Sequence, residues 1–135
     1  MMWDEANPTL RITWINLKRH EPDQGSGMNL VENIFAPIPD NRKDELIEAI
    51  LQASNFRIER IVSQGHCSPE GFWYDQNENE WVILLKGSAG LRFDDKEELV
   101  VLHPGDYIQI PRHLKHRVEW TDADQETVWL AEHYK

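Results

Sequence analysis

The fold is decided by the stretch Gly105-Asp-Tyr-Ile-Gln-Ile-Pro111, which is followed directly by Arg112-His113-Leu-Lys-His116. Together with the preceding Pro104, its first two residues form a Pro-Gly-Asp sequence that is typical of a tight turn. Tyr107–Ile110 then carry the side chains of a strand, and Pro111 ends that strand because proline has no N–H to donate to a ladder. His116 begins the returning strand, so the stretch predicts two strands joined by a short loop.

Outward from this stretch, the residues after Asn55 form further short strand-like runs. Turn residues such as Gly87-Ser88 and Asp94-Asp95 separate the runs at the spacing of an antiparallel sandwich or barrel. The predicted fold class is therefore all-β. The runs are Phe56–Ser63, Trp81–Lys86, Ala89–Phe93, Leu99–Leu102, Tyr107–Ile110, His116–Trp120 and Thr127–Ala131.

One N-terminal helix is predicted before these strands, over Asp44–Gln52. Leu46 and Ile50 are four residues apart, as are Ile47 and Leu51, so all four lie on one stripe of a helix. Acidic residues at the start of the segment suit the positive amino end of a helix. We expect this helix to pack against the outside of the strands.

Residues 1–27 differ from the rest of the chain and are interpreted as an N-terminal arm and linker, with the β-domain spanning residues 28–135. The arm holds one extended-looking run, Leu10–Leu17, and ends in the polar, Gly-rich segment His20–Gly27. We expect the run to cover an exposed sheet edge by adding a strand, in a homodimer.

Composition excludes several partners. Lys and Arg number 14 against 24 Asp and Glu, which gives a net charge of −10 that repels nucleic acid and anionic membrane surfaces. No apolar run approaches the roughly 20 residues of a membrane span, and no secretory signal begins the chain, so a cytoplasmic location is expected. The lone Cys67 agrees with a reducing compartment.

The stretch quoted first resembles the second sequence motif of the cupin superfamily. Five residues separate Gly105 from Pro111, and His116 falls on the histidine that binds a metal in that family. His113 stands where the family has a glycine, and Trp120 where it has an asparagine. The resemblance implies a cupin-type antiparallel β-barrel, similar to a jelly roll.

The first cupin motif is matched less fully. Glu80 and Gly87 have the six-residue interval of the family, but neither of its two paired histidines is present. Counted back from Glu80, those positions fall on Trp73 and Asp75 or on Tyr74 and Gln76, and counted forward from Gly65 they fall on Gly71 and Trp73. The segments Ser68–Gln76, Asn79–Val82 and His116–Thr121 further resemble a group of small bacterial cupins that has no settled activity.

The resemblance implies a site at the barrel mouth that binds a small polar ligand. The family holds its metal with three imidazoles and one carboxylate, of which Glu80 and His116 remain here. Asp75 is the predicted third ligand because it is anionic, whereas Gln76 offers only a neutral amide oxygen. This set favours manganese, iron or zinc.

Other residues complete the predicted site. Trp73, Tyr74 and Gln76 are predicted to line the ligand cavity, with apolar walls and polar tips. Glu80 is the predicted catalytic general base if the protein is an enzyme. Two interpretations stay open: a metal-dependent cupin enzyme acting on a small molecule, and a metal-free binding or sensing module. A third is that the domain acts mainly through self-association.

Overall fold

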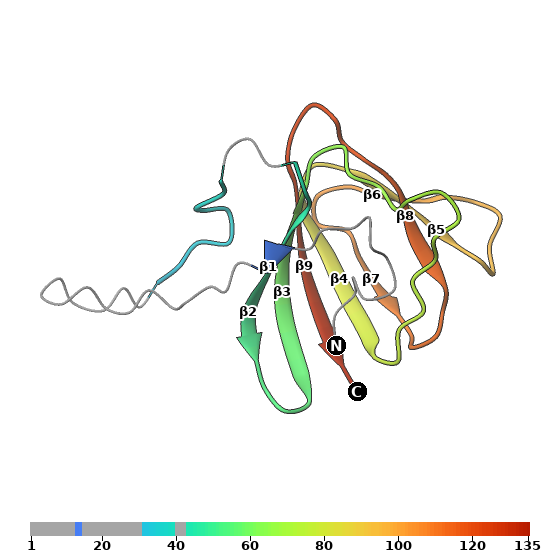
Figure 1. Ribbon diagram of the computed structural model, residues 1–135, viewed down its shortest axis with the longest axis horizontal. Coiled ribbons are helices and arrows are strands. Elements are labelled where there is room, and N and C mark those ends of the chain that lie inside the picture. Colours follow the sequence, from blue (N-terminus) through green and yellow to red (C-terminus); the bar gives the residue numbers. More distant parts are fainter. Residues whose placement is uncertain (1–12, 15–30, 40–42) are drawn as a thin grey trace, which may run out of the picture.

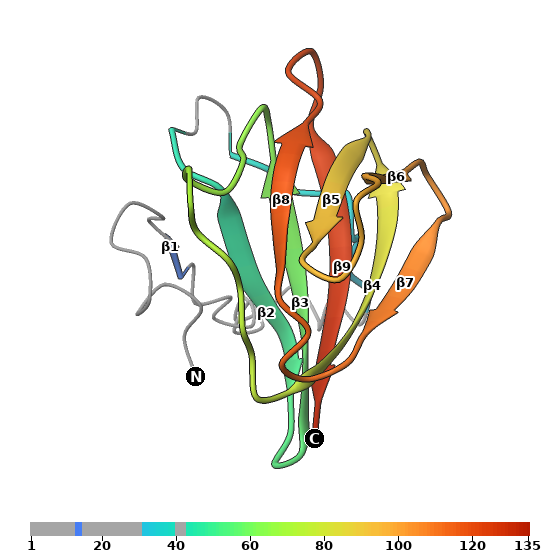
Figure 2. The same ribbon diagram turned by 90° about the vertical axis from the view of Figure 1, so that its right-hand side faces the viewer.

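The computed structural model describes residues 13–14, 31–39 and 43–135. They form two sheets that face each other as a barrel, one with the order β1-β2-β3-β9-β4-β7 and one with the order β6-β5-β8 (Figures 1 and 2). These described residues contain no helix, and therefore none long and apolar enough to span a membrane. The strands are β1 (Thr13–Trp14), β2 (Leu46–Gln52), β3 (Phe56–Ser63), β4 (Asn79–Lys86), β5 (Ala89–Phe93), β6 (Val100–Leu102), β7 (Tyr107–Ile110), β8 (His116–Thr121) and β9 (Thr127–Tyr134).

The all-β prediction is confirmed, because the seven strand-like runs after Asn55 correspond to strands β3 to β9. The turn predicted at Gly87-Ser88 joins β4 to β5, and Gly87 has a φ of 86°. A side chain at Gly87 would lie 2.3 Å from the Oγ1 atom of Thr127. Both the backbone conformation and the lack of space therefore require glycine at this turn.

The main hydrophobic core lies between the two sheets and is built by alternate residues of each strand. In β4, for example, Glu80, Val82 and Leu84 are buried while the residues between them are partly exposed. The core combines side chains from strands of both sheets, and Val118 of β8 packs against it. Its buried members are Ile47, Ile61, Val82, Leu84, Ala89, Leu91, Phe93, Leu102, Ile110, Trp129 and Ala131.

The helix predicted over Asp44–Gln52 is wrong, because this segment forms strand β2, antiparallel to β3. Ile47 packs in the core between the sheets, whereas Leu46 packs in a second apolar cluster on the outer face. Ile50 and Leu51, which would complete the helical stripe, are exposed. The first residues of β2 are buried on both faces of the sheet, and a bulge follows between Ala49 and Leu51. These two features of a strand produced the four-residue apolar spacing that resembled a helix.

The segment 31–39 lies against the outer face of the larger sheet. Its Ile38 packs on a cluster formed by Leu46, Val62 and Val128. Beside this cluster, the Arg60 guanidinium donates hydrogen bonds to main-chain carbonyls of residues 34, 36 and 37. The segment is thus fixed to the sheet by both apolar and polar contacts.

Most of the predicted arm, including the proposed boundary between residues 27 and 28, lies outside the described residues. Within the predicted run Leu10–Leu17, Thr13–Trp14 form strand β1. This strand pairs in parallel with β2 of the same chain, with Thr13 opposite Leu46. The described part of the arm therefore covers an edge of its own sheet, while the homodimer stays a prediction.

Candidate ligand-binding site

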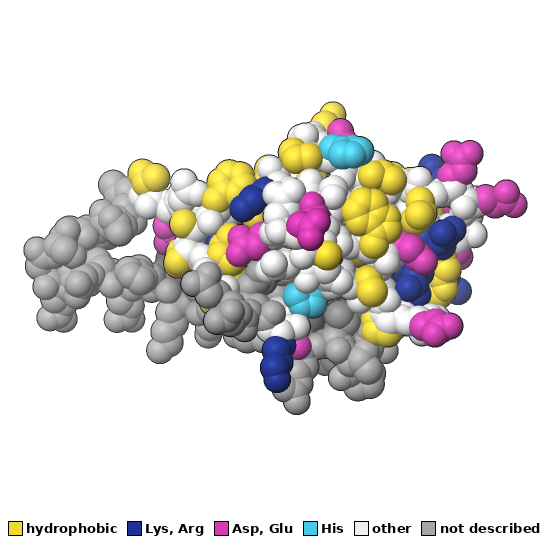
Figure 3. Space-filling model, turned by 90° about the horizontal axis from the view of Figure 1, so that it is seen from above, with side chains coloured by type: hydrophobic (Ala, Val, Ile, Leu, Met, Phe, Trp, Pro, Cys, Tyr) yellow, Lys and Arg dark blue, Asp and Glu magenta, His cyan; other side chains and the backbone are white. Residues whose placement is uncertain are grey.

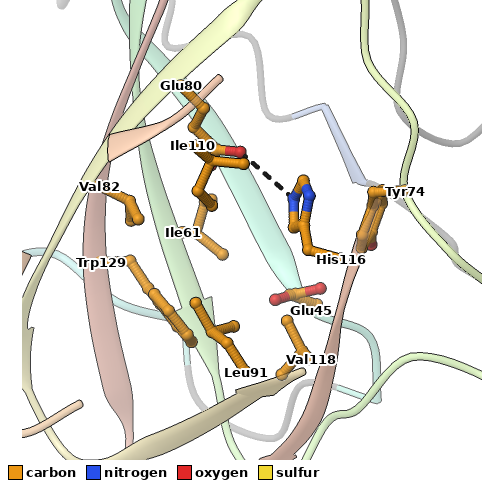
Figure 4. A pocket seen from close by; sticks show the side chains of 10 residues that line it. All are labelled: Glu45, Ile61, Tyr74, Glu80, Val82, Leu91, Ile110, His116, Val118 and Trp129. Atoms are coloured by element: carbon orange, nitrogen blue, oxygen red, sulfur yellow. Dashed lines mark ion pairs between the residues drawn. The ribbon is translucent and has the colours of Figure 1, made fainter. Parts of the chain in front are cut away.

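Glu80 and His116 meet inside the barrel, although they come from different sheets. Glu80 is the second residue of β4, and His116 is the first residue of β8. The Nε2 atom of His116 lies 3.6 Å from the Oε1 atom of Glu80, and both side chains are about 95% buried (Figure 4). The two motif intervals predicted that these residues face each other, and the structure places them so.

The orientation of His116 is fixed by its neighbours. Its Nδ1 atom lies 2.9 Å from the carbonyl oxygen of Leu114, to which it can donate a hydrogen bond. Its main chain exchanges hydrogen bonds with Tyr74, and the rings of these two residues are stacked at 5.5 Å. The Nε2 atom of His116 is consequently held toward Glu80.

The two groups favour each other's charged form. Burial would raise the pKa of Glu80, but the close approach and positive charge of His116, with the charges of His133 and Arg57, outweigh burial and hold the pKa below its ordinary value. Burial would lower the pKa of His116, but Glu80 and the Leu114 carbonyl raise it above its ordinary value. Each group therefore shifts the pKa of the other toward the ionised form.

This ion pair predicts a window of pH in which it stabilises the fold. The contribution of Glu80 is complete above its ordinary pKa of 4.5 and is lost as the pH falls through its lower folded value. The contribution of His116 is complete below its ordinary pKa of 6.5 and is lost as the pH rises through its higher folded value. Stabilisation by the pair should therefore be greatest between pH 4.5 and 6.5.

Urea unfolding of the wild type and of His116→Gln, measured from about pH 3 to about pH 9, tests this window. The difference in unfolding free energy between the two proteins should be largest between the two ordinary pKa values and should shrink on either side. A difference that stays constant over the whole pH range would show that the pair is not ionised.

The pair faces a narrow cavity between the sheets. The cavity has a volume of about 30 Å³, which is room for about one or two water molecules. Figure 4 shows that most of its wall is hydrocarbon, with the carboxylates and the imidazole projecting into it. The lining residues are Glu45, Ile61, Tyr74, Glu80, Val82, Leu91, Ile110, His116, Val118 and Trp129.

Glu45 is a lining residue that the sequence analysis missed, because it was assigned to the start of a helix. It lies just before β2, two residues from the inward-facing Ile47, and its Oε1 atom accepts a hydrogen bond of 2.7 Å from the Ser63 hydroxyl. Burial, followed by the charges of Glu45 and Glu80, raises the pKa of Tyr74. The Tyr74 hydroxyl therefore keeps its proton.

Three of the other predicted site residues, Trp73, Asp75 and Gln76, do not join Glu80 and His116 at the cavity. Asp75 is exposed, and its Oδ1 atom lies 2.8 Å from Nδ1 of His113 rather than beside Glu80 and His116. Trp73 is half-buried and does not line the cavity. Gln76 is buried, and its Nε2 atom has no hydrogen-bond partner within the described residues. Of the three predicted ligand contacts, only Tyr74 lines the cavity.

The family of the chain follows from comparison with known proteins. A family model described as the cupin domain matches residues 61–131, which is more than half of the chain. The chain is a cupin. Its sequence matches none of the curated proteins. Among solved structures, this cupin is similar to a putative mannose-6-phosphate isomerase from Ralstonia eutropha JMP134. The two share 43% sequence identity and superpose with a TM-score of 0.76, over 78% of this chain and 97% of the other.

Two more distant structures share the cupin fold. One is a cupin superfamily protein from Desulfitobacterium hafniense DCB-2, with 18% identity, a TM-score of 0.59 and coverage of 72% and 83% of the two chains. The other is an RmlC-like cupin from Methanocaldococcus jannaschii, with 18% identity, a TM-score of 0.57 and coverage of 73% and 86%. At these identities the likeness shows the fold alone.

Cupins often bind a divalent metal, but the donors of this cupin do not fit one. Glu80 and His116 supply one oxygen and one nitrogen, and Asp75 lies outside the cavity. In the part of the chain that the structure describes, no three His, Cys, Asp or Glu side chains converge on one point. The remaining wall is hydrocarbon, and the cavity has room for too few waters to complete a coordination shell.

Proposed function

We propose that this cupin is a metal-free binding module for a small molecule that has an apolar body and one hydrogen-bond donor, an amine or a hydroxyl. One observation carries the proposal. The Oε1 atom of Glu80 is buried beside an apolar cavity, and its ion-pair partner, the Nε2 atom of His116, lies 3.6 Å away, just beyond hydrogen-bond distance. A buried acceptor of this kind is costly unless something donates to it.

The apolar body of the ligand follows from the cavity wall. Ile61, Val82, Leu91, Ile110 and Val118 line it together with Trp129. A small hydrocarbon group that displaces water from such a wall gains about 25 cal/mol for each Å² that it buries. Contact with this apolar wall therefore supplies most of the ligand's affinity, and the hydrogen bond from its one polar group to Glu80 fixes its orientation.

The charged side chains of the cavity indicate that the ligand carries a hydrogen-bond donor. Two carboxylates, Glu45 and Glu80, project into the cavity, and the one cationic side chain among the lining residues, His116, is already paired. An amine or hydroxyl could donate a hydrogen bond to Oε1 of Glu80, which His116 approaches only to 3.6 Å, whereas an anionic group would be repelled.

The name of the Ralstonia relative suggests a sugar phosphate as an alternative ligand. A phosphate needs cationic donors, which this cavity lacks within the described residues. On the face shown in Figure 3, the described Lys and Arg side chains lie interspersed with Asp and Glu and form no basic patch. We therefore do not extend that relative's activity to this protein.

Entry of a ligand larger than water requires one wall to move. Tyr74 lies on the segment 67–78, which is attached to β8 through main-chain hydrogen bonds at Ser68 and Tyr74. The Arg117 guanidinium donates to the carbonyls of Ser68, Pro69 and Phe72 and holds the segment in place. Outward movement of this segment would enlarge the cavity on the side of the His116 ring.

The ionisation of the site favours binding over proton transfer. A carboxylate whose pKa lies below its ordinary value is a weak base near neutral pH. Glu80 is therefore better suited to accept a hydrogen bond from a ligand than to remove a proton from it. The predicted binding of a divalent metal is an outcome that the Zn²⁺ comparison in the following experiment can reveal.

Three molecules with one carbon skeleton test the proposal: isobutylamine, isobutanol and isobutyrate. Each is titrated into the ¹⁵N-labelled full chain, and the indole N–H of Trp129, which lines the cavity, is followed by NMR. The amine and the alcohol should shift this signal in a saturable way, and the carboxylate should not. Mannose 6-phosphate and Zn²⁺ serve as further comparisons. A saturable response to the carboxylate, the sugar phosphate or the metal alone would contradict the proposal.

A further inference from the structure

The segment 67–78 closes one side of the barrel next to the cavity. Strand β8 is an edge strand of the smaller sheet, and this segment runs along its free edge (Figure 2). The main chain of Ser68 donates a hydrogen bond to Val118, and Tyr74 exchanges two hydrogen bonds with His116. Because Val118, Tyr74 and His116 all line the cavity, separation of the segment from β8 would open directly into it.

The middle of this segment, residues 69–72, forms a turn that one side chain ties to the barrel. The N–H of Phe72 donates to the carbonyl of Pro69 and closes the turn on itself. Among the described residues, the only hydrogen bonds between this turn and the rest of the protein come from the Arg117 guanidinium. Gly71 has a φ of 77°, and a side chain there would meet nothing within 4 Å, so the tip of the turn is not braced by packing.

All three guanidinium nitrogens of Arg117 are engaged. Its Nη1 atom donates to the carbonyl oxygens of Pro69 and Phe72 at 2.9 Å and 3.2 Å, and its Nη2 atom donates to that of Ser68 at 3.1 Å. Its Nε atom donates to Oε2 of Glu119 at 2.9 Å. Because the guanidinium is planar, the contact with Glu119 orients the other two nitrogens toward the segment. The Arg117 side chain is only 12% exposed.

Glu119 also separates two like charges. Arg92 of β5 lies opposite Arg117 of β8 in the register of the smaller sheet, where like charges destabilise each other. Oε2 of Glu119 lies 3.4 Å from Nε of Arg92 and 2.9 Å from Nε of Arg117, so the two arginines share it. Among the described residues, the Arg92 side chain donates otherwise only to the carbonyl of Glu97. Arg92 therefore contacts Glu119 as Arg117 does but does not hold the segment.

The turn contacts the cavity wall through two aromatic rings. The ring of Phe72 meets the ring of Tyr74 edge-on, with centroids 4.8 Å apart. The Tyr74 ring in turn stacks on His116 at 5.5 Å, and both of these residues line the cavity (Figure 4). Movement of the turn away from the barrel would therefore separate Phe72 from Tyr74 and remove one of the contacts that keep the Tyr74 ring in the wall.

We propose that the turn 69–72 is a flap that controls entry to the cavity, and that Arg117 is the latch that holds it closed. When the contacts of Arg117 with the turn break, the turn moves outward and the wall beside Tyr74 opens. This inference rests on the proposed function only in that the cavity is where the ligand binds. A flap held by one side chain can open while the rest of the barrel stays folded, as an element that admits a ligand must.

The first test measures access to the cavity without any ligand. Cys67 is the only cysteine of the chain, so Cys67→Ser with Ile61→Cys leaves a single thiol in the buried cavity wall. Its reaction with iodoacetamide should become about 10-fold faster or more when Arg117→Gln is added, because losing a hydrogen bond to a charged group shifts an equilibrium by about that factor. The matched addition of Arg92→Gln should leave the rate unchanged. A rate that Arg117→Gln does not raise, or that Arg92→Gln raises equally, would overturn the proposal.

A measurement on the wild type covers the case in which Arg117→Gln does not fold. Amide hydrogen exchange of the full chain is followed by NMR at several low urea concentrations. The amides of Ser68 and Tyr74, which donate to β8, should be less protected than that of Val82 in β4. Their exchange should also depend little on urea, because opening a flap exposes little surface.

If the amides of Ser68 and Tyr74 exchange only with the protection and urea dependence of Val82, the turn does not open by itself and the proposal fails. Because neither measurement uses a ligand, a failure of amine binding would count against the proposed function and leave this inference standing.

Discussion

Replacing Glu80 by glutamine should weaken binding of isobutylamine by about 10- to 100-fold. A hydrogen bond to a charged acceptor contributes about 1.5 to 3 kcal/mol, which corresponds to that change in affinity. The amide keeps the size of the side chain, so the cavity wall is preserved, but it removes the carboxylate that the ligand's donor requires. Affinity is measured by NMR titration of the Trp129 indole signal.

The matched control is Glu132→Gln, a change of the same kind on β9. Glu132 is adjacent in sequence to the inward-facing His133, so its side chain lies on the opposite, outer face of the sheet. Its affinity for the amine should equal that of the wild type. Equal weakening in the two variants would mean that the amine responds to overall negative charge and not to the cavity.

Replacing Arg60 by alanine should lower the free energy of unfolding by about 3 to 5 kcal/mol, because it leaves the carboxylate of Glu48 buried without a partner. Both side chains are about 97% buried, and the Nε atom of Arg60 donates to Oε1 of Glu48 at 2.6 Å. The same guanidinium fixes residues 34–37 on the outer face. The loss is measured by urea unfolding.

A double variant separates the buried charge from the lost packing. Arg60→Met with Glu48→Leu removes both charges and keeps apolar volume, so it should recover much of the stability that Arg60→Ala loses. If the double variant is as unstable as the single one, the loss comes from detachment of residues 34–37 and not from the unpaired carboxylate.

The strands were predictable because their signal is local. The runs from Phe56 to Ala131 carry strand-forming residues between turn residues, and both kinds of signal can be seen in a few neighbouring positions. The pairing of Glu80 with His116 was also predictable, through the intervals of the two cupin motifs. These intervals encode a barrel geometry that the strands then reproduce.

The remaining features depend on which strands become neighbours. The four-residue spacing in Leu46–Gln52 predicted a helix, and only pairing with β3 makes the segment a strand. That error also hid Glu45. The contact between His133 and Glu59 requires β3 and β9 to be adjacent, although these residues are far apart in the sequence. Asp75 was placed in the site by its charge, but its loop turns it toward His113.

The most direct test of the proposed site is a crystal structure of the full chain, purified without chelator and soaked with isobutylamine. The account predicts density for the amine in the cavity, with its nitrogen about 3 Å from Oε1 of Glu80 and no anomalous signal from a first-row transition metal. A metal peak between Glu80 and His116, or an amine bound only elsewhere on the protein, would contradict it.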